Sequence, residues 1–380
     1  MKKLLALIMA LIVTLTPAAA IETLPEDAIS IPAPHAVLME KETGEIIFSK
    51  DADEHVLPAS VTKIMTILLI VEALEDGTIT MDDMVTASAR ARSMGGSQVY
   101  LADGESMTVR DMLKAIVVSS ANDAAVAMAE HLCGTEEGFV ARMNSRAKEL
   151  GMENTNFNNC TGLFDDDGHY TSAMDVAVMS RELIKHDMIK EFTTIWMDSL
   201  RDGAFGLSNT NKLVRRYEGC TGLKTGYTSA AGHCLSATAE RDGVEYIAVV
   251  MGCSSSDERF DSATALLNYA FANYALARFQ PKEAIPPVRV LLGETGSLQP
   301  VVSGNDAMLL KKSDINALEY SVDLVDEVEA PVAAGQSLGK VTVTLSGEEI
   351  ASLDLVSDQD IQRLSPIAIF GNLLRMFYGG

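Results

Sequence analysis

Two groups of predicted β-strands stand at opposite ends of a long helical stretch, and this order restricts the fold of residues 21–280 more than any other feature. Residues 36–49 alternate apolar and polar side chains around a turn at 41–44, a pattern typical of a hairpin. Further strands are predicted over 219–225, 232–239 and 244–253. Strands so far apart can share one sheet only if the chain returns to it after the helices. We therefore expect an α+β domain, in which helices flank an antiparallel sheet and an all-helical subdomain is inserted.

The stretch between these strands carries helical periodicity and capping residues. Apolar residues recur over 61–74, with Ile64, Leu68 and Val71 on one face of the predicted helix. Thr108 stands three positions before Asp111, the spacing of a capping box, so Thr108 is the predicted N-cap. The other helices are predicted over 109–118, 123–132, 136–150, 173–185 (capped by Ser172) and 257–279, the last of which closes the unit.

The sequence changes character after residue 282. Pro281, Pro286 and Pro287 indicate a linker between a domain over 21–282 and one over 286–357. The second domain contains short alternating strands and Gly turns, which predict a small all-β sandwich.

Residues 360–380 predict an amphipathic helix that begins with Ser365 as N-cap and Pro366 in the first position. Such a helix can lie in the membrane interface, although packing on the protein's own β domain is the alternative. Its apolar side would carry Ile367, Phe370, Leu374 and Phe377, and its polar side Asn372 and Arg375.

The first twenty residues have the pattern of a secretory signal peptide. Lys2 and Lys3 precede an apolar run, and the small residues that end at Ala20 suit cleavage there. An uncleaved N-terminal anchor is the alternative. We therefore expect an exported protein that acts on the outer face of the cytoplasmic membrane and is bound there peripherally.

Charge and cysteine content exclude several kinds of partner. The formal net charge of −23 does not suit binding to nucleic acid, which needs clustered Lys and Arg. The five cysteines contain no C-x-x-C pair and do not cluster with the six histidines. We therefore expect buried free thiols, no metal site and no cofactor.

Three short motifs carry the candidate chemistry. S-x-x-K also occurs at Ser145 and Ser337, and S-x-N also occurs at Ser303, so each motif alone is a weak signal. Their settings are more specific, because the first motif begins an apolar helix, the second joins two helices and the third lies on a strand. The motifs are Ser60-Val61-Thr62-Lys63, Ser120-Ala121-Asn122 and Lys224-Thr225-Gly226.

These residue types suit nucleophilic catalysis. A serine hydroxyl needs a base, and residues three apart on a helix share a face, so Lys63 can reach Ser60. Burial and the positive charge of Lys224 would lower the pKa of Lys63 and leave its amine neutral. Ser120 can relay a proton from Lys63 to a departing amine. Asn122 can hydrogen-bond the backbone of a substrate.

The strand motif suits recognition of a carboxylate. Lys224 and Thr225 can hold the carboxylate that ends a peptide chain. The helix N-terminus at Ser60 favours negative charge on the attacking oxygen. The N–H of Tyr227, which follows Gly226, and the N–H of Ser60 are expected to form an oxyanion hole.

This ordered set resembles the penicillin-recognising serine enzymes, and in detail the low-molecular-mass D-Ala-D-Ala carboxypeptidases of peptidase family S11. The resemblance covers roughly residues 30–280, and the following β domain also fits the family. Ala121 and Cys160 depart from the residues that the family commonly has at these positions. The stretches that support it are 58–63, 120–124, 162–163, 169–173, 209–213 and 222–226.

The resemblance implies a serine β-lactamase/DD-peptidase-like fold and an acyl-enzyme on Ser60. It implies Lys63 as proton acceptor, Ser120 as second active-site hydroxyl and Lys224 as carboxylate-binding residue. The expected substrates are peptidoglycan pentapeptide stems that end in D-Ala-D-Ala, and β-lactams would act as covalent inhibitors.

Two other functions are alternatives to this one. A class A β-lactamase needs a glutamate that activates water, and residues 154–175 contain none. Asp165, Asp166 and Asp167 stand there in a loop and are expected to be solvated. A non-enzymatic penicillin sensor or wall-binding protein is disfavoured by the intact catalytic residues.

Overall fold

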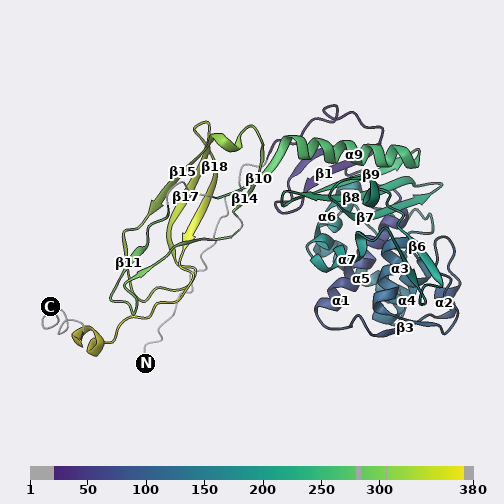
Figure 1. Ribbon diagram of the computed structural model, residues 1–380, viewed down its shortest axis with the longest axis horizontal. Coiled ribbons are helices and arrows are strands. Elements are labelled where there is room, and N and C mark those ends of the chain that lie inside the picture. The colour runs from purple at the N-terminus through teal and green to yellow at the C-terminus, as the bar shows by residue number, and fades with distance from the viewer. Residues whose placement is uncertain (1–20, 280–283, 305, 372–380) are drawn as a thin grey trace, which may run out of the picture. The chain divides into compact units, whose positions relative to one another are not determined.

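The computed structural model describes residues 21–279, 284–304 and 306–371, and these form two compact units (Figure 1). The first unit comprises Ile21–Ala275, and the second begins at Leu276. The predicted signal peptide lies outside the described residues, as does the predicted helix beyond residue 371.

The first unit contains the predicted sheet of distant strands. It has five antiparallel strands in the order β2-β1-β9-β8-β7. Val37 of the first hairpin pairs with Val249, which confirms that the chain returns to the sheet after the helices. The strands are β1 (His35–Glu40), β2 (Ile46–Lys50), β7 (Cys220–Thr228), β8 (Gly232–Arg241) and β9 (Val244–Cys253).

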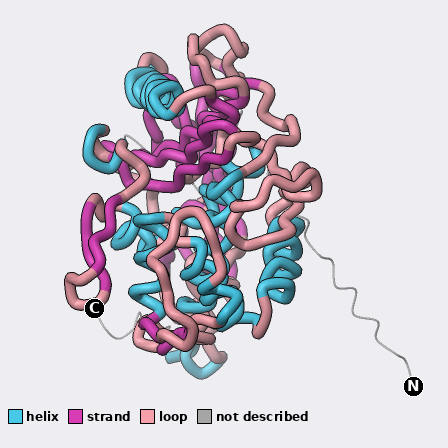
Figure 2. The backbone as a smooth tube through the Cα atoms, turned by 90° about the vertical axis from the view of Figure 1, so that its right-hand side faces the viewer, coloured by secondary structure: helices cyan, strands magenta, loops and turns pink. Residues whose placement is uncertain are grey.

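Helices cover both faces of this sheet, which explains why β9 is apolar over most of its length. The long helix α9 (Ser256–Asn273) packs on β8 and β9, and α6 (Ala173–Ile184) packs on β1 and β9. The sheet thus lies between α9 and the larger group of helices (Figures 1 and 2).

The inserted helical region is built around α1 (Lys63–Glu75). Residues 63–71 are all buried, so the prediction of a single apolar face at Ile64, Leu68 and Val71 was too narrow for this central helix. Around it lie α2 (Ala89–Arg92), α3 (Val109–Ser119), α4 (Asn122–Cys133) and α5 (Glu136–Glu149), with the hairpins β3 (Met84–Thr86)–β4 (Ser106–Thr108) and β5 (Met197–Leu200)–β6 (Phe205–Ser208). Shorter turns of helix are η1 (Ala59–Thr62), η2 (Asp187–Ile189), α7 (Lys190–Thr193) and α8 (Leu213–Arg216).

Two predicted N-caps are confirmed, and one predicted helix end is wrong. Thr108 Oγ1 accepts from the Asp111 N–H at 3.1 Å, and Ser172 Oγ accepts from the Asp175 N–H at 3.1 Å. The helix predicted over 257–279 stops at Asn273, and β10 (Tyr274–Arg278) follows it. This strand pairs with β14 (Ala307–Lys311), a partner distant in sequence that local periodicity does not reveal.

The second unit is all-β, as predicted. Its strands form a four-stranded sheet, β13-β18-β17-β15, and a three-stranded sheet, β12-β11-β16. Buried residues such as Val341 and Leu355 form one apolar cluster, and Val288 and Leu338 belong to another. The elements are β11 (Val288–Leu291), β12 (Ser297–Leu298), β13 (Val301–Val302), β14 (Ala307–Lys311), η3 (Ile315–Ala317), β15 (Leu318–Leu324), β16 (Glu327–Glu329), β17 (Ser337–Leu345) and β18 (Glu348–Val356).

The start of the predicted C-terminal helix is present. Residues 366–371 are helical, and Ser365 Oγ accepts from the Ala368 N–H at 3.2 Å, which confirms Ser365 as N-cap. Ile367 and Phe370 are exposed. Within the described ranges, no helix combines the length and the apolar composition that crossing a membrane requires.

The five cysteine thiols are free in the described structure. Cys160, Cys234 and Cys253 are buried, and Cys133 and Cys220 are partly buried. Burial raises the pKa of the Cys160 thiol well above its usual value, which keeps this thiol neutral.

Candidate active site

The first motif lies in one turn of 3₁₀-helix and at the start of the α-helix that follows it. Ser60 lies in η1, and α1 begins only at Lys63. The spacing of three residues still places Lys63 Nζ 3.0 Å from Ser60 Oγ, as the sequence predicted. Lys63 Nζ also donates to the carbonyl oxygen of Thr161 at 2.8 Å, so a distant loop holds the amine in place.

Lys63 is fully buried, and this changes its acidity. Burial lowers the pKa of Lys63 to about 7, against the opposing influence of Cys160 and Asp123. Burial, rather than the neighbouring Lys224, is thus the main cause. An amine with this pKa is partly neutral near pH 7 and can accept a proton from a serine hydroxyl.

The second motif lies at the junction of two helices, as predicted. Ser120 ends α3 in the left-handed conformation, with φ of 64° and ψ of 32°, and Asn122 begins α4. Asn122 is anchored on one side, because its Nδ2 donates to the Gly95 carbonyl at 2.8 Å. Ser120 Oγ and Asn122 Oδ1 are buried and have no hydrogen-bond partner among the described residues. Buried polar atoms are rarely left without a partner, which makes these two atoms candidates for hydrogen bonds to a ligand.

The third motif lies on β7, the edge strand of the sheet. Lys224 Nζ donates to the Thr225 carbonyl at 2.9 Å, and Thr225 Oγ1 donates to Thr210 Oγ1 at 2.7 Å. Burial lowers the pKa of Lys224 well below its usual value, and the positive charges of Lys63 and Arg259 lower it further.

The edge strand runs directly beside η1. A β-carbon on Gly226 would lie 3.1 Å from the backbone nitrogen of Ser60 and 2.9 Å from the carbonyl of Pro58. Only glycine therefore lets the two backbones approach so closely. Tyr227, the next residue, is 58% exposed and stacks on the ring of His233, with 4.3 Å between ring centroids.

Arg259 is a buried cation that the sequence analysis missed. Its Nη1 donates to the carbonyl of Gly226 at 3.0 Å, and within the described ranges it forms no ion pair. It comes from α9, outside every motif, so no local pattern identified it. The guanidinium of Arg259 is close enough to Lys224 to lower the pKa of that amine, and a positive charge at this position suits an anionic ligand.

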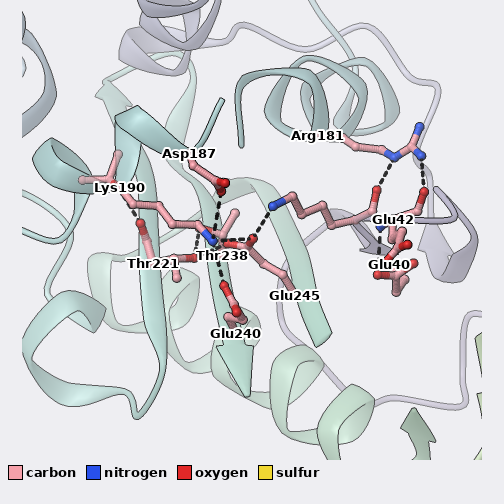
Figure 3. A network of polar contacts seen from close by, with 11 residues as sticks. Glu40, Glu42, Arg181, Asp187, Lys190, Thr221, Thr238, Glu240 and Glu245 are labelled. Atoms are coloured by element: carbon pink, nitrogen blue, oxygen red, sulfur yellow. Dashed lines mark hydrogen bonds and ion pairs between the residues drawn. The ribbon is translucent and has the colours of Figure 1, made fainter. Parts of the chain in front are cut away.

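A polar network fixes the beginning of β7 (Figure 3). The buried Glu245 accepts from Thr221 Oγ1 at 2.6 Å and from Lys41 at 2.9 Å, and Lys190 lies 3.2 Å from the same carboxylate. Thr221 precedes the K-T-G motif on this strand. The network therefore holds the strand that carries the third motif.

The loop that follows residue 162 carries the three aspartates. All three are exposed, as expected for solvated side chains. Asp165 Oδ1 accepts from Thr228 Oγ1 at 2.6 Å, which connects this loop to the end of β7.

Comparisons with known protein families match both units. The family described as D-alanyl-D-alanine carboxypeptidase, peptidase S11, matches residues 21–255. The family described as penicillin-binding protein 5, C-terminal domain, matches residues 279–363.

Individual relatives agree with these families. The chain is 43% identical over 336 residues to the D-alanyl-D-alanine carboxypeptidase DacF of Bacillus subtilis, covering 87% of this chain and 86% of that one. Penicillin-binding protein 5 from Haemophilus influenzae matches with a TM-score of 0.76 and 30% identity, covering 90% of this chain and 100% of that one. Penicillin-binding protein D2 from Listeria monocytogenes, solved in its ampicillin-bound form, matches with a TM-score of 0.59 and 31% identity, covering 65% of this chain and 100% of that one.

Proposed function

Because this chain belongs to the S11 family of D-alanyl-D-alanine carboxypeptidases, we propose that Ser60 is its nucleophile and Lys63 the base that activates it. The protein is a serine-type D-alanyl-D-alanine carboxypeptidase and a penicillin-binding protein. The observation that carries the assignment of roles is the 3.0 Å contact between Ser60 Oγ and the buried Lys63 Nζ.

Acylation starts when Ser60 Oγ attacks the carbonyl carbon between the two D-alanines and its proton passes to Lys63. The tetrahedral oxyanion then accepts hydrogen bonds from the N–H groups of Ser60 and Tyr227. The close approach of Gly226 to the Ser60 nitrogen supports this pairing of donors. Collapse breaks the C–N bond, and Lys63 returns the proton to the departing D-alanine amine with Ser120 as the relay. This step requires the Ser120 hydroxyl, which has no partner among the described residues, to contact the Lys63 amine in the substrate complex. Water then hydrolyses the ester on Ser60.

Substrate binding relies on the strand motif and its charged neighbours. The terminal carboxylate of the stem peptide binds beside Lys224 and Thr225, where the charge of Arg259 also favours an anion. Asn122 Oδ1, which has no partner among the described residues, accepts from a backbone N–H of the substrate. A β-lactam carries a carboxylate and a strained amide, placed much as the terminal carboxylate and the cleaved amide are placed in the stem peptide. It acylates Ser60, but its amine stays tethered to the acyl group.

The test is to replace Ser60 and to measure two activities. Ser60→Ala should abolish release of D-alanine from a peptide ending in D-Ala-D-Ala and covalent labelling by fluorescent penicillin. Ser145→Ala is the matched control, because Ser145 begins another S-x-x-K sequence but lies on α5. Stoichiometric labelling of Ser60→Ala would show that the nucleophile is another residue.

The family acts on peptidoglycan, and we place this protein on the outer face of the cytoplasmic membrane. The signal-like pattern of residues 1–20 supports export. Exposed Ile367 and Phe370 at the start of the C-terminal helix support peripheral anchoring through the apolar face of that helix.

A further inference from the structure

The carbonyl oxygen of Ala59 ends a short chain of hydrogen bonds that begins at the buried ring of His169. Thr62 Oγ1 donates to the Ala59 oxygen at 2.8 Å. His169 Nε2 lies 2.8 Å from Thr62 Oγ1. On the other side of the ring, the backbone N–H of Asn158 donates to His169 Nδ1 at 3.0 Å.

These partners allow only one arrangement of protons in a neutral ring. A backbone N–H can only donate, so His169 Nδ1 is the acceptor and carries no proton. The ring proton is therefore on Nε2 and is donated to Thr62, whose own hydroxyl proton remains for Ala59. Burial lowers the pKa of His169 to about 4, which agrees with a neutral ring at pH 7.

The Ala59 oxygen matters because it belongs to the same peptide group as the N–H of Ser60. A trans peptide is planar, with its C=O and N–H pointing in opposite directions. A fixed Ala59 oxygen therefore fixes the direction of the Ser60 N–H. Ala59 also has a φ of +46°, a conformation that is unfavourable for residues other than glycine and that its surroundings must hold.

We propose that His169 is a positioning residue for the oxyanion hole, which acts through Thr62 and the Ala59 carbonyl to aim the Ser60 N–H at the developing oxyanion. This rests on the proposed role of Ser60. Hydrogen bonding at the carbonyl also polarises the peptide group and strengthens its N–H as a donor. His169 itself is 1% exposed and acts at a distance from the substrate.

The test compares variants that keep or remove one donor. A glutamine amide can place its nitrogen near the position of His Nε2, so His169→Gln retains a donor to Thr62. An asparagine amide is shorter, so His169→Asn keeps only an acceptor for the Asn158 N–H. Thr62→Val removes the hydroxyl and keeps the shape, whereas Thr62→Ser keeps the hydroxyl. For each variant, kcat and KM for D-alanine release are measured per active site, with sites counted by complete penicillin labelling.

We expect His169→Asn and Thr62→Val each to lower kcat by about 10- to 100-fold, somewhat less than full loss of an oxyanion donor, with KM changed little. His169→Gln and Thr62→Ser should stay within about fivefold of the unaltered enzyme, and the double variant should be no slower than the slower single variant. A boronic-acid analogue of the substrate, which forms a tetrahedral adduct, should lose affinity in parallel with kcat/KM.

Unchanged kcat per site in His169→Asn, or equal losses in the Asn and Gln variants, would overturn the proposal. If His169→Asn does not fold, the pair Thr62→Val and Thr62→Ser decides the question alone. The Ser60→Ala variant tests the premise, which is that Ser60 is the nucleophile, independently of the role of His169. If that variant still becomes labelled, the assigned nucleophile is wrong; if it does not and all four variants behave alike, only the role of His169 is wrong.

Discussion

Gly162 lies so close to Ala59 that a β-carbon added to this glycine would be 1.8 Å from the Ala59 carbonyl oxygen. Gly162 also has a φ of +69°, which disfavours any other residue. The loop that supplies the Thr161 carbonyl to Lys63 thus packs directly against the peptide that precedes the nucleophile. Close packing at this point therefore involves the segments that position both Ser60 and Lys63.

Gly162→Ala should therefore damage both stability and activity. We expect the free energy of unfolding to fall by more than about 3 kcal/mol, because backbone strain and a backbone clash add together. The rate of penicillin acylation should fall with it. Gly151→Ala is the matched control, since Gly151 has a φ of +75° but open space around it, and it should cost only about 1 kcal/mol. Equal losses in the two variants, measured by chemical denaturation, would mean that the contact with Ala59 is unimportant.

The two buried lysines should respond differently to replacement by arginine. Lys63→Arg should lower kcat for D-alanine release by at least about 10²-fold, because a guanidinium stays protonated and cannot act as a base. Lys224→Arg should retain more activity and should mainly raise KM, because its role is to attract the substrate carboxylate. Steady-state kinetics on both variants checks this order, and the reverse order would mean that the two roles are exchanged.

The pKa of Lys63 predicts how acylation depends on pH. Below about pH 7 the amine is protonated and cannot accept the serine proton, so the acylation rate should fall as pH decreases. Above that pH the neutral amine dominates, and the rate should reach a plateau. Stopped-flow acylation by penicillin between pH 5 and 9 would give an apparent pKa near 7, within about one unit. A rate that stays constant over this range, in protein that remains folded by circular dichroism, would contradict Lys63 as the base.

The C-terminal segment offers a test of membrane anchoring that leaves the β domain intact. Ile361 is buried, and the Leu364 N–H donates to the Leu292 carbonyl at 2.8 Å, so the chain should be ended after Leu364 rather than earlier. We expect this truncated protein to move from the membrane fraction to the soluble fraction and to release D-alanine at an unchanged rate. Retention on membranes as firm as that of the full chain would rule out the helix as the anchor.

Much of the site follows from relationships that are local in the sequence. The spacing of Ser60 and Lys63 predicts their contact, because any helical turn brings residues three apart to one face. Thr108 and Ser172 predict helix starts for the same local reason, since an N-cap binds the N–H group three residues later. The order of the three motifs, each in its own setting, was enough to predict the family and the fold class.

Other features depend on which distant segments pack together, and no local pattern records that. Arg259 meets the carbonyl of Gly226 only because α9 packs on the sheet, and β10 replaces the last turns of a predicted helix because it pairs with a distant strand. The pKa of Lys63 is another such property, because it depends on burial by the surrounding chain rather than on the motif. His169 contacts Thr62, which lies 107 residues earlier in the chain, and Thr62 donates to the Ala59 carbonyl. Sequence periodicity describes neighbours along a helix or strand, whereas these contacts arise when separate elements bury their surfaces against one another.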